Sequence, residues 1–465
     1  MKKIANRNCL LISTPMLNRT FPRSIVSIAS FLETQGYTAE VVHLAHYLGY
    51  NSDWSFEEVE KILKDIIQDR DPSVVGISNQ VTADYPMCEE IAKICKKLNE
   101  DIVTVVGGLH VTFLDEESAG SPFIDFIVRS EGEWTMLELL STLENGTDLE
   151  QVKGITFKKN GETIRTPNRP MGELSKLPSL NLGLMPAEFY QKAFMLGMIN
   201  RGCTNHCTYC AEGAFWKRRR SFPVDYLIDE LKTLNRVYNT SMNGIEDSMI
   251  FLGSSQFSEM CNKMKENEIF LKPDFYIMSR VDSVNDKGLR DVKDTGISKV
   301  CLGIESGSPK VLKLMNKRID RDQVLSACTK LRENDLNPVG MFMFGHPGET
   351  LEDAEQTLEL LAYLIEKDLI AIADLYVFVP FPGTPFFKNP EKYGVEILTY
   401  KWADWYQYGV TNPVYRLADF PPEDIISCYH RAFEIAKAGG AEADFWTEDN
   451  FPLTASTGKR ERMWT

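Results

Sequence analysis

The chain lacks features that mark several common classes of protein. It has no run of about 20 apolar residues, which a transmembrane helix requires. The apolar segment near the amino terminus, Cys9 to Ile12, is too short for the core of a signal peptide. Basic residues are outnumbered, with 51 Lys and Arg against 66 Asp and Glu and a formal net charge of −15. We therefore expect a cytoplasmic protein that neither spans a membrane nor binds nucleic acid.

Two further absences concern dinucleotides and disulfides. No Gly-x-Gly-x-x-Gly follows the first expected strand, where Pro15-Met16-Leu17-Asn18 stands, so a dinucleotide site is disfavoured. Most of the ten cysteines are scattered without the spacing of a disulfide framework, namely Cys9, Cys88, Cys95, Cys261, Cys301, Cys328 and Cys428. We expect these to be reduced structural thiols.

The remaining three cysteines stand together in Arg201-Gly202-Cys203-Thr204-Asn205-His206-Cys207-Thr208-Tyr209-Cys210. Their C-x3-C-x2-C spacing directly follows an apolar run over residues 194–199. Three thiolates this close can bind one metal centre, yet they cannot complete a tetrahedral zinc site or cap all four irons of a [4Fe-4S] cluster. One iron would stay open to a substrate or cofactor. A chance grouping of cysteines in a loop is the alternative.

Strands and helices alternate over the first third of the chain. Short β-rich runs at 9–14, 39–44, 74–78, 102–106 and 126–128 are separated by helical periodicity at 24–35, 56–67 and 87–98. This pattern predicts a Rossmann-like, doubly wound parallel sheet whose ligand lies beyond the carboxyl ends of the strands. The residues expected at those ends are Ser78, Asn79, Gly107, Gly108, His110 and Glu131.

A hairpin at 152–167 and a proline-rich linker lead into a second alternating region. We expect strands at 194–199, 248–252, 274–279, 300–304, 340–345 and 374–380, with helices between them. Six such units predict a partial (βα)6 barrel of the TIM type. The predicted domains are 1–150, 151–190 for the hairpin and linker, 191–388 for the barrel, and 389–465 for a small α-rich substrate or lid region.

Two charged residues follow barrel strands, where such folds carry their chemistry. Glu305, in Gly303-Ile304-Glu305-Ser306-Gly307, can accept both hydroxyls of a ribose, or it can simply cap a helix. Arg280 can bind a carboxylate through two parallel hydrogen bonds, or it can form a surface ion pair. His346, in a turn pinned by Pro347 and Gly348, lines the cavity or supports the turn.

Together these motifs resemble the cobalamin-binding radical S-adenosylmethionine (SAM) enzymes, and the methyltransferases among them, over roughly residues 8–385. The resemblance implies that Cys203, Cys207 and Cys210 hold a [4Fe-4S] cluster. Its open iron would bind SAM, and one-electron reduction would cleave SAM to a 5′-deoxyadenosyl radical. It also implies that Tyr209 lies beside the adenine and that Arg280 and Glu305 belong to the SAM pocket.

The same resemblance makes the first domain a cobalamin-binding domain, with Ser78, Asn79, Gly107, Gly108, His110 and Glu131 beside the cofactor. Other cobalamin proteins carry Asp-x-His-x-x-Gly, whose His binds the cobalt. Here His46-Tyr47-Leu48-Gly49 matches only the second half, and Leu44 stands where the Asp would be. The resemblance therefore implies no protein histidine on the cobalt, and we interpret His43 and His46 as ordinary polar residues.

One departure from the family concerns the SAM amino group. The family places an acidic pair after the second barrel strand, whereas the expected strand at 248–252 is followed by Gly253-Ser254-Ser255-Gln256. Ser254, Ser255 or Gln256 would then accept the ammonium as neutral groups. Glu246 and Asp247 would stand at the wrong end of that strand.

The expected function is cobalamin-dependent methylation of an unactivated carbon in a small molecule or peptide, with flavodoxin or ferredoxin as the reductant. Alternatives are a non-methylating radical reaction, such as cyclisation, rearrangement or oxidation, and a non-catalytic cobalamin or iron-sulfur protein. Methylthio transfer is disfavoured, because the amino-terminal domain lacks a second cysteine trio and the tail lacks an obvious RNA-binding barrel.

Overall fold

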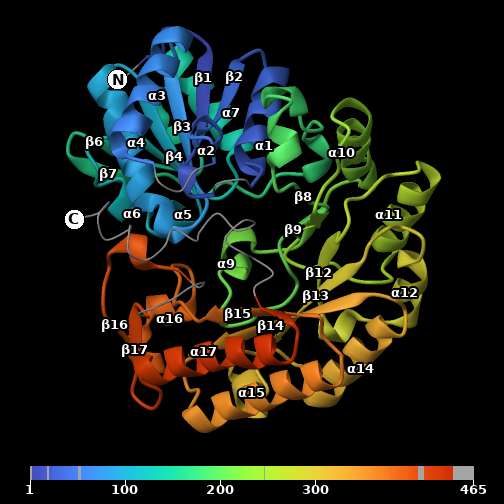
Figure 1. Ribbon diagram of the computed structural model, residues 1–465. Coiled ribbons are helices and arrows are strands. Elements are labelled where there is room, and N and C mark those ends of the chain that lie inside the picture. Colours follow the sequence, from blue (N-terminus) through green and yellow to red (C-terminus); the bar gives the residue numbers. More distant parts are fainter. Residues whose placement is uncertain (1–2, 18–19, 51–53, 246, 407–412, 444–465) are drawn as a thin grey trace. The chain divides into compact units, whose positions relative to one another are not determined.

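The computed structural model describes residues 3–17, 20–50, 54–245, 247–406 and 413–443. The chain divides into two units, one running to Ala193 and the other beginning at Phe194, and Figure 1 shows their elements. Within the described ranges, no helix combines the length and the apolar character needed to cross a bilayer.

The first unit is built on a seven-stranded sheet with the order β2-β1-β3-β4-β5-β6-β7. Strands β1 to β5 are parallel, and the hairpin β6–β7 extends the sheet in the antiparallel sense. The strands are β1 (Asn8–Ser13), β2 (Thr38–His43), β3 (Val74–Asn79), β4 (Val103–Gly108), β5 (Phe126–Val128), β6 (Ile155–Lys159) and β7 (Glu162–Arg165). The doubly wound sheet and the hairpin confirm the prediction.

Helices connect these strands, and their boundaries follow local chemistry. In α3, Ser55 and Glu58 form a capping box that satisfies the first backbone N–H groups. The apolar faces of α1 and α7 pack with Leu11 and Val105 of the sheet in one core. The helices are α1 (Arg23–Thr34), α2 (Leu44–Tyr47), α3 (Phe56–Arg70), α4 (Tyr85–Leu98), α5 (Leu109–Phe113), α6 (Asp115–Ser118), α7 (Glu133–Asn145) and α8 (Phe189–Lys192).

The second unit contains an all-parallel sheet with the order β18-β15-β14-β13-β12-β11-β8. The strands are β8 (Leu196–Gly197), β11 (Gly244–Ile245), β12 (Tyr276–Arg280), β13 (Lys299–Glu305), β14 (Asn337–Phe344), β15 (Ile372–Val377) and β18 (Glu442–Ala443). Five of the first six match strands expected for the partial barrel, and β11 does not. Two small antiparallel pairs accompany them, β9 (Asn200–Arg201) with β10 (Arg220–Ser221), and β16 (Val395–Ile397) with β17 (Tyr415–Leu417).

Helices α10, α11, α12, α14 and α15 follow one another along the outer face of this sheet (Figure 1). The helices are α9 (Glu212–Trp216), α10 (Val224–Val237), α11 (Ser255–Glu266), α12 (Asp286–Val292), α13 (Pro309–Leu314), α14 (Arg321–Arg332), α15 (Leu351–Glu366), α16 (Pro385–Lys388) and α17 (Pro422–Ala438). Because α17 packs against α15 and β18 pairs with β15, the described residues between 389 and 443 belong to this unit.

One predicted strand is wrong. The second barrel strand is Gly244–Ile245, not residues 248–252. Met249, Ile250 and Leu252 are buried, so their apolar character reflects burial in the core and not membership of the sheet. Because the strand ends at Ile245, Asp247 follows its carboxyl end, which corrects the expectation that it stands at the wrong end. Glu246 lies outside the described residues.

Candidate active site

The three cysteines of the C-x3-C-x2-C motif lie in one loop of the second unit. The loop runs from β9 to α9, and each of the three cysteine residues is partly exposed. Gly202 precedes them with a φ of 84°, and a Cβ there would approach the Arg218 carbonyl oxygen to 2.7 Å. Only glycine suits this position, because it is crowded and has a positive φ.

Polar groups surround the thiols. The backbone N–H and side-chain Nδ2 of Asn205 each lie 3.4 Å from Cys203 Sγ, and Arg280 Nη1 lies 3.9 Å from Cys207 Sγ. Burial, the Glu212 carboxylate and the two other thiols raise the pKa of Cys210 to about 12. The thiols are therefore within electrostatic reach of one another, and two of them have donors placed to stabilise a thiolate.

This arrangement fits an iron-sulfur cluster. Across the described ranges, no group of three Cys, His, Asp or Glu side chains converges on a point where a single ion would bind. A [4Fe-4S] cluster bonds each thiolate to a different iron, so its ligands stand apart. Three thiols leave the fourth iron without a cysteine, as the motif predicts.

The cysteine loop is pinned to the turn that follows α13. Thr208 N–H donates to the Met315 carbonyl at 3.1 Å, and Thr208 Oγ1 donates to the Leu314 carbonyl at 3.1 Å. Asn316 Nδ2 donates to the His206 carbonyl at 2.9 Å. These bonds hold the loop in place independently of any cluster.

A buried ion pair stands beside Tyr209. Lys317 Nζ lies 2.7 Å from Glu305 Oε1 and 3.2 Å from the Tyr209 hydroxyl, which itself donates to Glu305 Oε1 at 2.9 Å. Glu305 is 6% and Lys317 4% exposed. Burial and the neighbouring Glu305 charge raise the pKa of Tyr209 well above its usual value. A Cβ at Gly303 would lie 2.6 Å from both charged groups, so glycine makes room for the pair.

Arg280 ends β12, and its guanidinium is buried and uses four of its five N–H donors. Its Nε and Nη2 donate to the two carboxylate oxygens of Asp282 at 2.9 and 3.0 Å, and Nη2 donates to the Lys317 carbonyl at 2.6 Å. Burial lowers the pKa of Arg280, but the Asp282 carboxylate outweighs it and the net shift is upward. The cation therefore stays charged within reach of Cys207.

Ser254 is the N-cap of α11, where its Oγ accepts the Phe257 N–H at 3.3 Å. Asp247 follows β11 and accepts from the backbone N–H groups of Ile199 and Asn200 at 2.8 and 3.1 Å. Burial raises the pKa of Asp247 to about 6. The Asn200 side-chain Nδ2 also donates to Asp247, at 2.5 Å. A carboxylate offers about four acceptor positions and a hydroxyl two, so Asp247 and Ser254 each retain one.

His346 lies in the turn after β14, beside Thr208 of the cysteine loop. Its Nδ1 lies 2.9 Å from the Pro347 carbonyl, which assigns Nδ1 as the donor, and its Nε2 lies 3.4 Å from Thr208 Oγ1. Burial lowers its pKa to about 4, so the ring is neutral near pH 7. Beneath it, Glu349 accepts from the Gly345 and His346 N–H groups at 2.6 and 3.0 Å.

The predicted cobalamin residues gather at the carboxyl edge of the first unit's sheet. Ser78 and Asn79 end β3 and pair in register with Gly107 and Gly108 of β4. Gly108 has a φ of 135°, and a Cβ there would lie 1.8 Å from the Asn79 carbonyl oxygen. At the ends of β3 and β4 this edge therefore presents only small or amide side chains, which suits a broad, flat ligand laid over the strand ends.

His110 and Glu131 flank this edge. His110 is fully buried and stacks on Tyr85 with the ring centres 4.6 Å apart, and burial lowers its pKa to about 3. Its backbone N–H donates to Asn79 Oδ1 at 3.0 Å. Glu131 follows β5 and accepts the Gly172 N–H at 3.2 Å. His110 is thus a neutral part of the wall beneath the edge.

His43 and His46, interpreted from the sequence as ordinary polar residues, are hydrogen-bonded within the first unit. His43 Nδ1 lies 2.6 Å from Ser13 Oγ, and His46 Nδ1 lies 2.9 Å from the Tyr50 hydroxyl. In each ring one nitrogen is therefore already occupied by a neighbouring hydroxyl.

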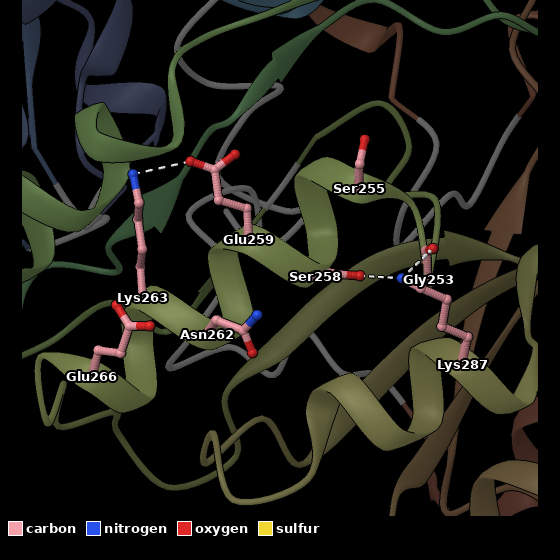
Figure 2. Close-up of a pocket in the computed structure, with 8 residues that line it drawn as sticks. All are labelled: Gly253, Ser255, Ser258, Glu259, Asn262, Lys263, Glu266 and Lys287. Atoms are coloured by element: carbon pink, nitrogen blue, oxygen red, sulfur yellow. Dashed lines mark hydrogen bonds and ion pairs between the residues drawn. The ribbon is translucent and has the colours of Figure 1, made fainter.

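A separate hollow of about 560 Å³ lies against α11 and is shown in Figure 2. Its cations are paired, since Lys263 contacts Glu259 at 2.9 Å and Lys287 donates to the Gly253 carbonyl at 2.8 Å. None of the cysteines lines it. We therefore place the chemistry at the cysteine loop and assign this hollow no role.

The structure adds Lys317 and Asp282 to the site, and neither was predicted from the sequence. Lys317 is 12 positions beyond Glu305, and no spacing rule connects the two. Asp282 stands two residues after Arg280. A charged residue so soon after a barrel strand is a weak local signal that could have been noticed.

Two family models match the chain, one in each of the two units. A family model described as the radical SAM superfamily matches residues 198–361, and one described as the B12 binding domain matches residues 12–140. An uncharacterised methyltransferase of Pyrococcus horikoshii is 30% identical over 407 residues, covering 85% of each chain. An anaerobic magnesium-protoporphyrin IX monomethyl ester cyclase from Rubrivivax gelatinosus is 26% identical, over 79% of this chain and 66% of its own.

Solved structures share the fold. TsrM from Kitasatospora setae, a radical SAM methyltransferase with tryptophan substrate and a SAM analogue bound, superposes with a TM-score of 0.70 at 16% identity, over 98% of this chain and 99% of that chain. OxsB, a cobalamin-dependent SAM radical enzyme with aqua-cobalamin and SAM bound, gives 0.65 at 20% identity, over 77% of this chain and 52% of its own.

Proposed function

Because the chain belongs to the cobalamin-dependent radical SAM family, whose cofactors are a [4Fe-4S] cluster, SAM and cobalamin, we propose that it methylates an unactivated carbon of a small molecule or peptide. The observation that carries this proposal is the hydrogen-bonded network that joins the cysteine loop, Tyr209, Glu305, Lys317 and Arg280. It gathers the three thiols and the groups suited to a nucleoside and an amino acid in one place.

When bound, the cluster supplies the electron that cleaves SAM, and cobalamin supplies the transferred methyl group. Cys203, Cys207 and Cys210 would hold the cluster and leave one iron open. Arg280 keeps a positive charge beside Cys207, which would attract a nearby carboxylate. Its tight pairing with Asp282 fixes the guanidinium before any ligand arrives.

Glu305, Tyr209 and Lys317 would form the nucleoside side of the SAM pocket. Lys317 compensates the Glu305 charge in a dry site, and the carboxylate can accept ribose hydroxyls. The Tyr209 ring would lie beside the adenine. We assign the SAM ammonium to Asp247, with Ser254 kept as the second candidate, because the carboxylate follows the strand and the hydroxyl caps a helix.

In the first unit, Ser78, Asn79, Gly107, Gly108 and Glu131 would cradle cobalamin at the edge of the sheet. His110 supports the cradle from below and gives the cobalt no ligand, because its ring is buried against Tyr85. Substrate would be a small molecule or peptide, and an external reductant would provide the electron.

Anaerobic reconstitution with iron, sulfide, cobalamin and SAM tests the proposal. Under strong reductant we expect 5′-deoxyadenosine, and in the presence of the true substrate 5′-deoxyadenosine together with S-adenosylhomocysteine. Replacing the three cysteines by alanine should abolish both products. No SAM cleavage by fully loaded protein would refute the enzymatic function and favour a carrier or sensor.

A non-methylating radical reaction is the second candidate, and the likeness to the Rubrivivax gelatinosus cyclase favours it. The two candidates differ in their products. Formation of 5′-deoxyadenosine without S-adenosylhomocysteine in the presence of the true substrate would support cyclisation, rearrangement or oxidation in place of methylation.

A further inference from the structure

Four consecutive basic residues, Lys217-Arg218-Arg219-Arg220, follow the cysteine loop of a chain with a net charge of −15. No Asp or Glu occurs from residue 213 to residue 224. Lys217 and Arg218 are exposed, and neither has an ion pair with any residue that the structure describes. The segment is therefore a local positive surface on a largely acidic molecule.

The other two arginines are used by the fold. Arg219 Nη2 donates to Gln256 Oε1 at 3.0 Å, and its guanidinium lies 5.3 Å from the centre of the Phe251 ring. Arg220 belongs to β10, opposite Arg201 of β9. These contacts leave Lys217 and Arg218 as the pair available to a partner.

The segment that carries Lys217 and Arg218 lies directly beside the cysteine loop. Strands β9 and β10 form one antiparallel ladder, which the cysteines and the basic segment connect. A Cβ on Gly202, the residue before Cys203, would lie 2.7 Å from the Arg218 carbonyl oxygen and 2.8 Å from Trp216 Cβ. The backbone of the basic segment therefore touches the backbone that leads into the first cysteine.

The turn that presents the pair is strained. Lys217 has φ 59° and ψ −35°, and the Arg218 N–H donates to the Trp216 carbonyl at 2.6 Å. This is a three-residue γ-turn with positive φ, a conformation that is rare and strained at a non-glycine residue. Glycine would relieve that strain, but it would remove a cation.

We propose that Lys217 and Arg218 are the docking site for an acidic one-electron donor protein of the flavodoxin or ferredoxin class. The inference rests on the proposed function, because a cluster that cleaves SAM must be reduced. In this step one electron leaves the reduced donor and enters the cluster, and no proton or group is transferred. A positive surface joined to the cysteine loop attracts an acidic donor to the part of the molecule that must receive the electron.

The direct test is binding. The double charge reversal K217E/R218E should weaken the affinity for an oxidised, acidic bacterial flavodoxin by about tenfold at low ionic strength, and the loss should shrink near 200 mM salt, where exposed charges are screened. Isothermal titration of the reconstituted protein measures both. The matched control K388E/K401E makes the same charge change at two exposed lysines outside the segment and should alter affinity less than about twofold.

A second readout separates docking from catalysis. With dithionite, K217E/R218E should cleave SAM at the wild-type rate, whereas with reduced flavodoxin it should be slower by about tenfold. The docking site would be overturned if K217E/R218E bound flavodoxin with wild-type affinity, or if the control K388E/K401E lost as much affinity. The docking site would also be overturned if the double variant lost binding to a single-stranded RNA but kept its affinity for flavodoxin. Wild-type protein inactive with dithionite would overturn the proposed function itself.

Discussion

Lys317 and Glu305 form an ion pair that water scarcely reaches. The two side chains are 5% and 8% exposed and lie 2.7 Å apart. Removing one member of such a pair leaves an uncompensated charge in a dry site, which costs far more than the pair contributes. The role of Lys317 therefore depends on its being beside Glu305, which no feature of the local sequence indicates.

Lys317→Met should lower the free energy of unfolding by about 3–5 kcal/mol, and adding Glu305→Gln should recover most of that loss. Denaturant unfolding of the two single variants and the double variant measures the coupling. Lys330→Met, which breaks an exposed pair with Asp286, should cost less than about 1 kcal/mol. Additive effects of Lys317→Met and Glu305→Gln would contradict the buried pair.

Glu349 should make stability depend on pH. Burial raises its pKa to about 8 from an unfolded value of 4.5, so the folded chain holds a proton that the unfolded chain releases. The contribution of Glu349 to the free energy of unfolding is fully present below about pH 4.5. It falls by up to about 1.4 kcal/mol per pH unit between about pH 4.5 and about pH 8. Glu349→Gln should remove that slope in unfolding measured from about pH 5 to pH 8.

The control for this measurement is Glu355→Gln. Glu355 lies in α15, the helix that begins just after Glu349. The Arg431 hydrogen bond lowers the pKa of Glu355, so its contribution changes only at more acidic pH. Its slope between about pH 5 and pH 8 should match the wild type. An unchanged slope in Glu349→Gln would show that the carboxylate is ionised when folded.

Among the secondary-structure elements, those of the first unit are the most predictable. Alternating β-rich and helical periods place β1 to β5 and the helices α1, α3 and α4 within a few residues, because each element's own apolar pattern decides its structure, whereas α7 was not predicted. The predicted strand at 248–252 is wrong for the opposite reason. Its apolar residues are buried outside the sheet, and only the tertiary fold decides that.

Ser254→Ala should separate helix capping from ligand binding. Loss of the N-cap of α11 should lower stability by about 1 kcal/mol, while the SAM affinity should change less than about twofold. Asp247→Asn should weaken SAM binding by about tenfold or more, since the ammonium would lose a charged acceptor. Titration of both variants with SAM measures the two affinities. A larger loss of SAM affinity in Ser254→Ala than in Asp247→Asn would assign the ammonium to the serine.

The β4 turn gives a prediction for the first unit. Gly108→Ala should reduce cobalamin affinity at least tenfold, because a Cβ would collide with the Asn79 carbonyl and displace the strand end. Gly146→Ala shares the positive φ, but no atom outside its chain neighbours lies within 4 Å of the added carbon, so it should cost stability only. Absorbance titration with cobalamin compares them. Equal affinities would remove this edge from the site.

At the level of the whole chain, the order of the two units and the kind of fold in each follow from the sequence, because alternating patterns and the cysteine spacing are local signals. The contacts that complete the candidate site do not. They bring residues 205–209, 280, 305 and 317 together from separate loops, and tertiary packing alone determines which of them meet.

We propose that three cysteines hold a [4Fe-4S] cluster with one iron open to SAM. Electron paramagnetic resonance of the anaerobically reconstituted and reduced protein tests this assignment. We predict a cluster signal that shifts when SAM is added, that is lost when Cys203, Cys207 and Cys210 are replaced by alanine, and that survives replacement of Cys95, Cys261 and Cys328. A signal that persists in the first triple variant, or that ignores SAM in the wild type, would contradict the account.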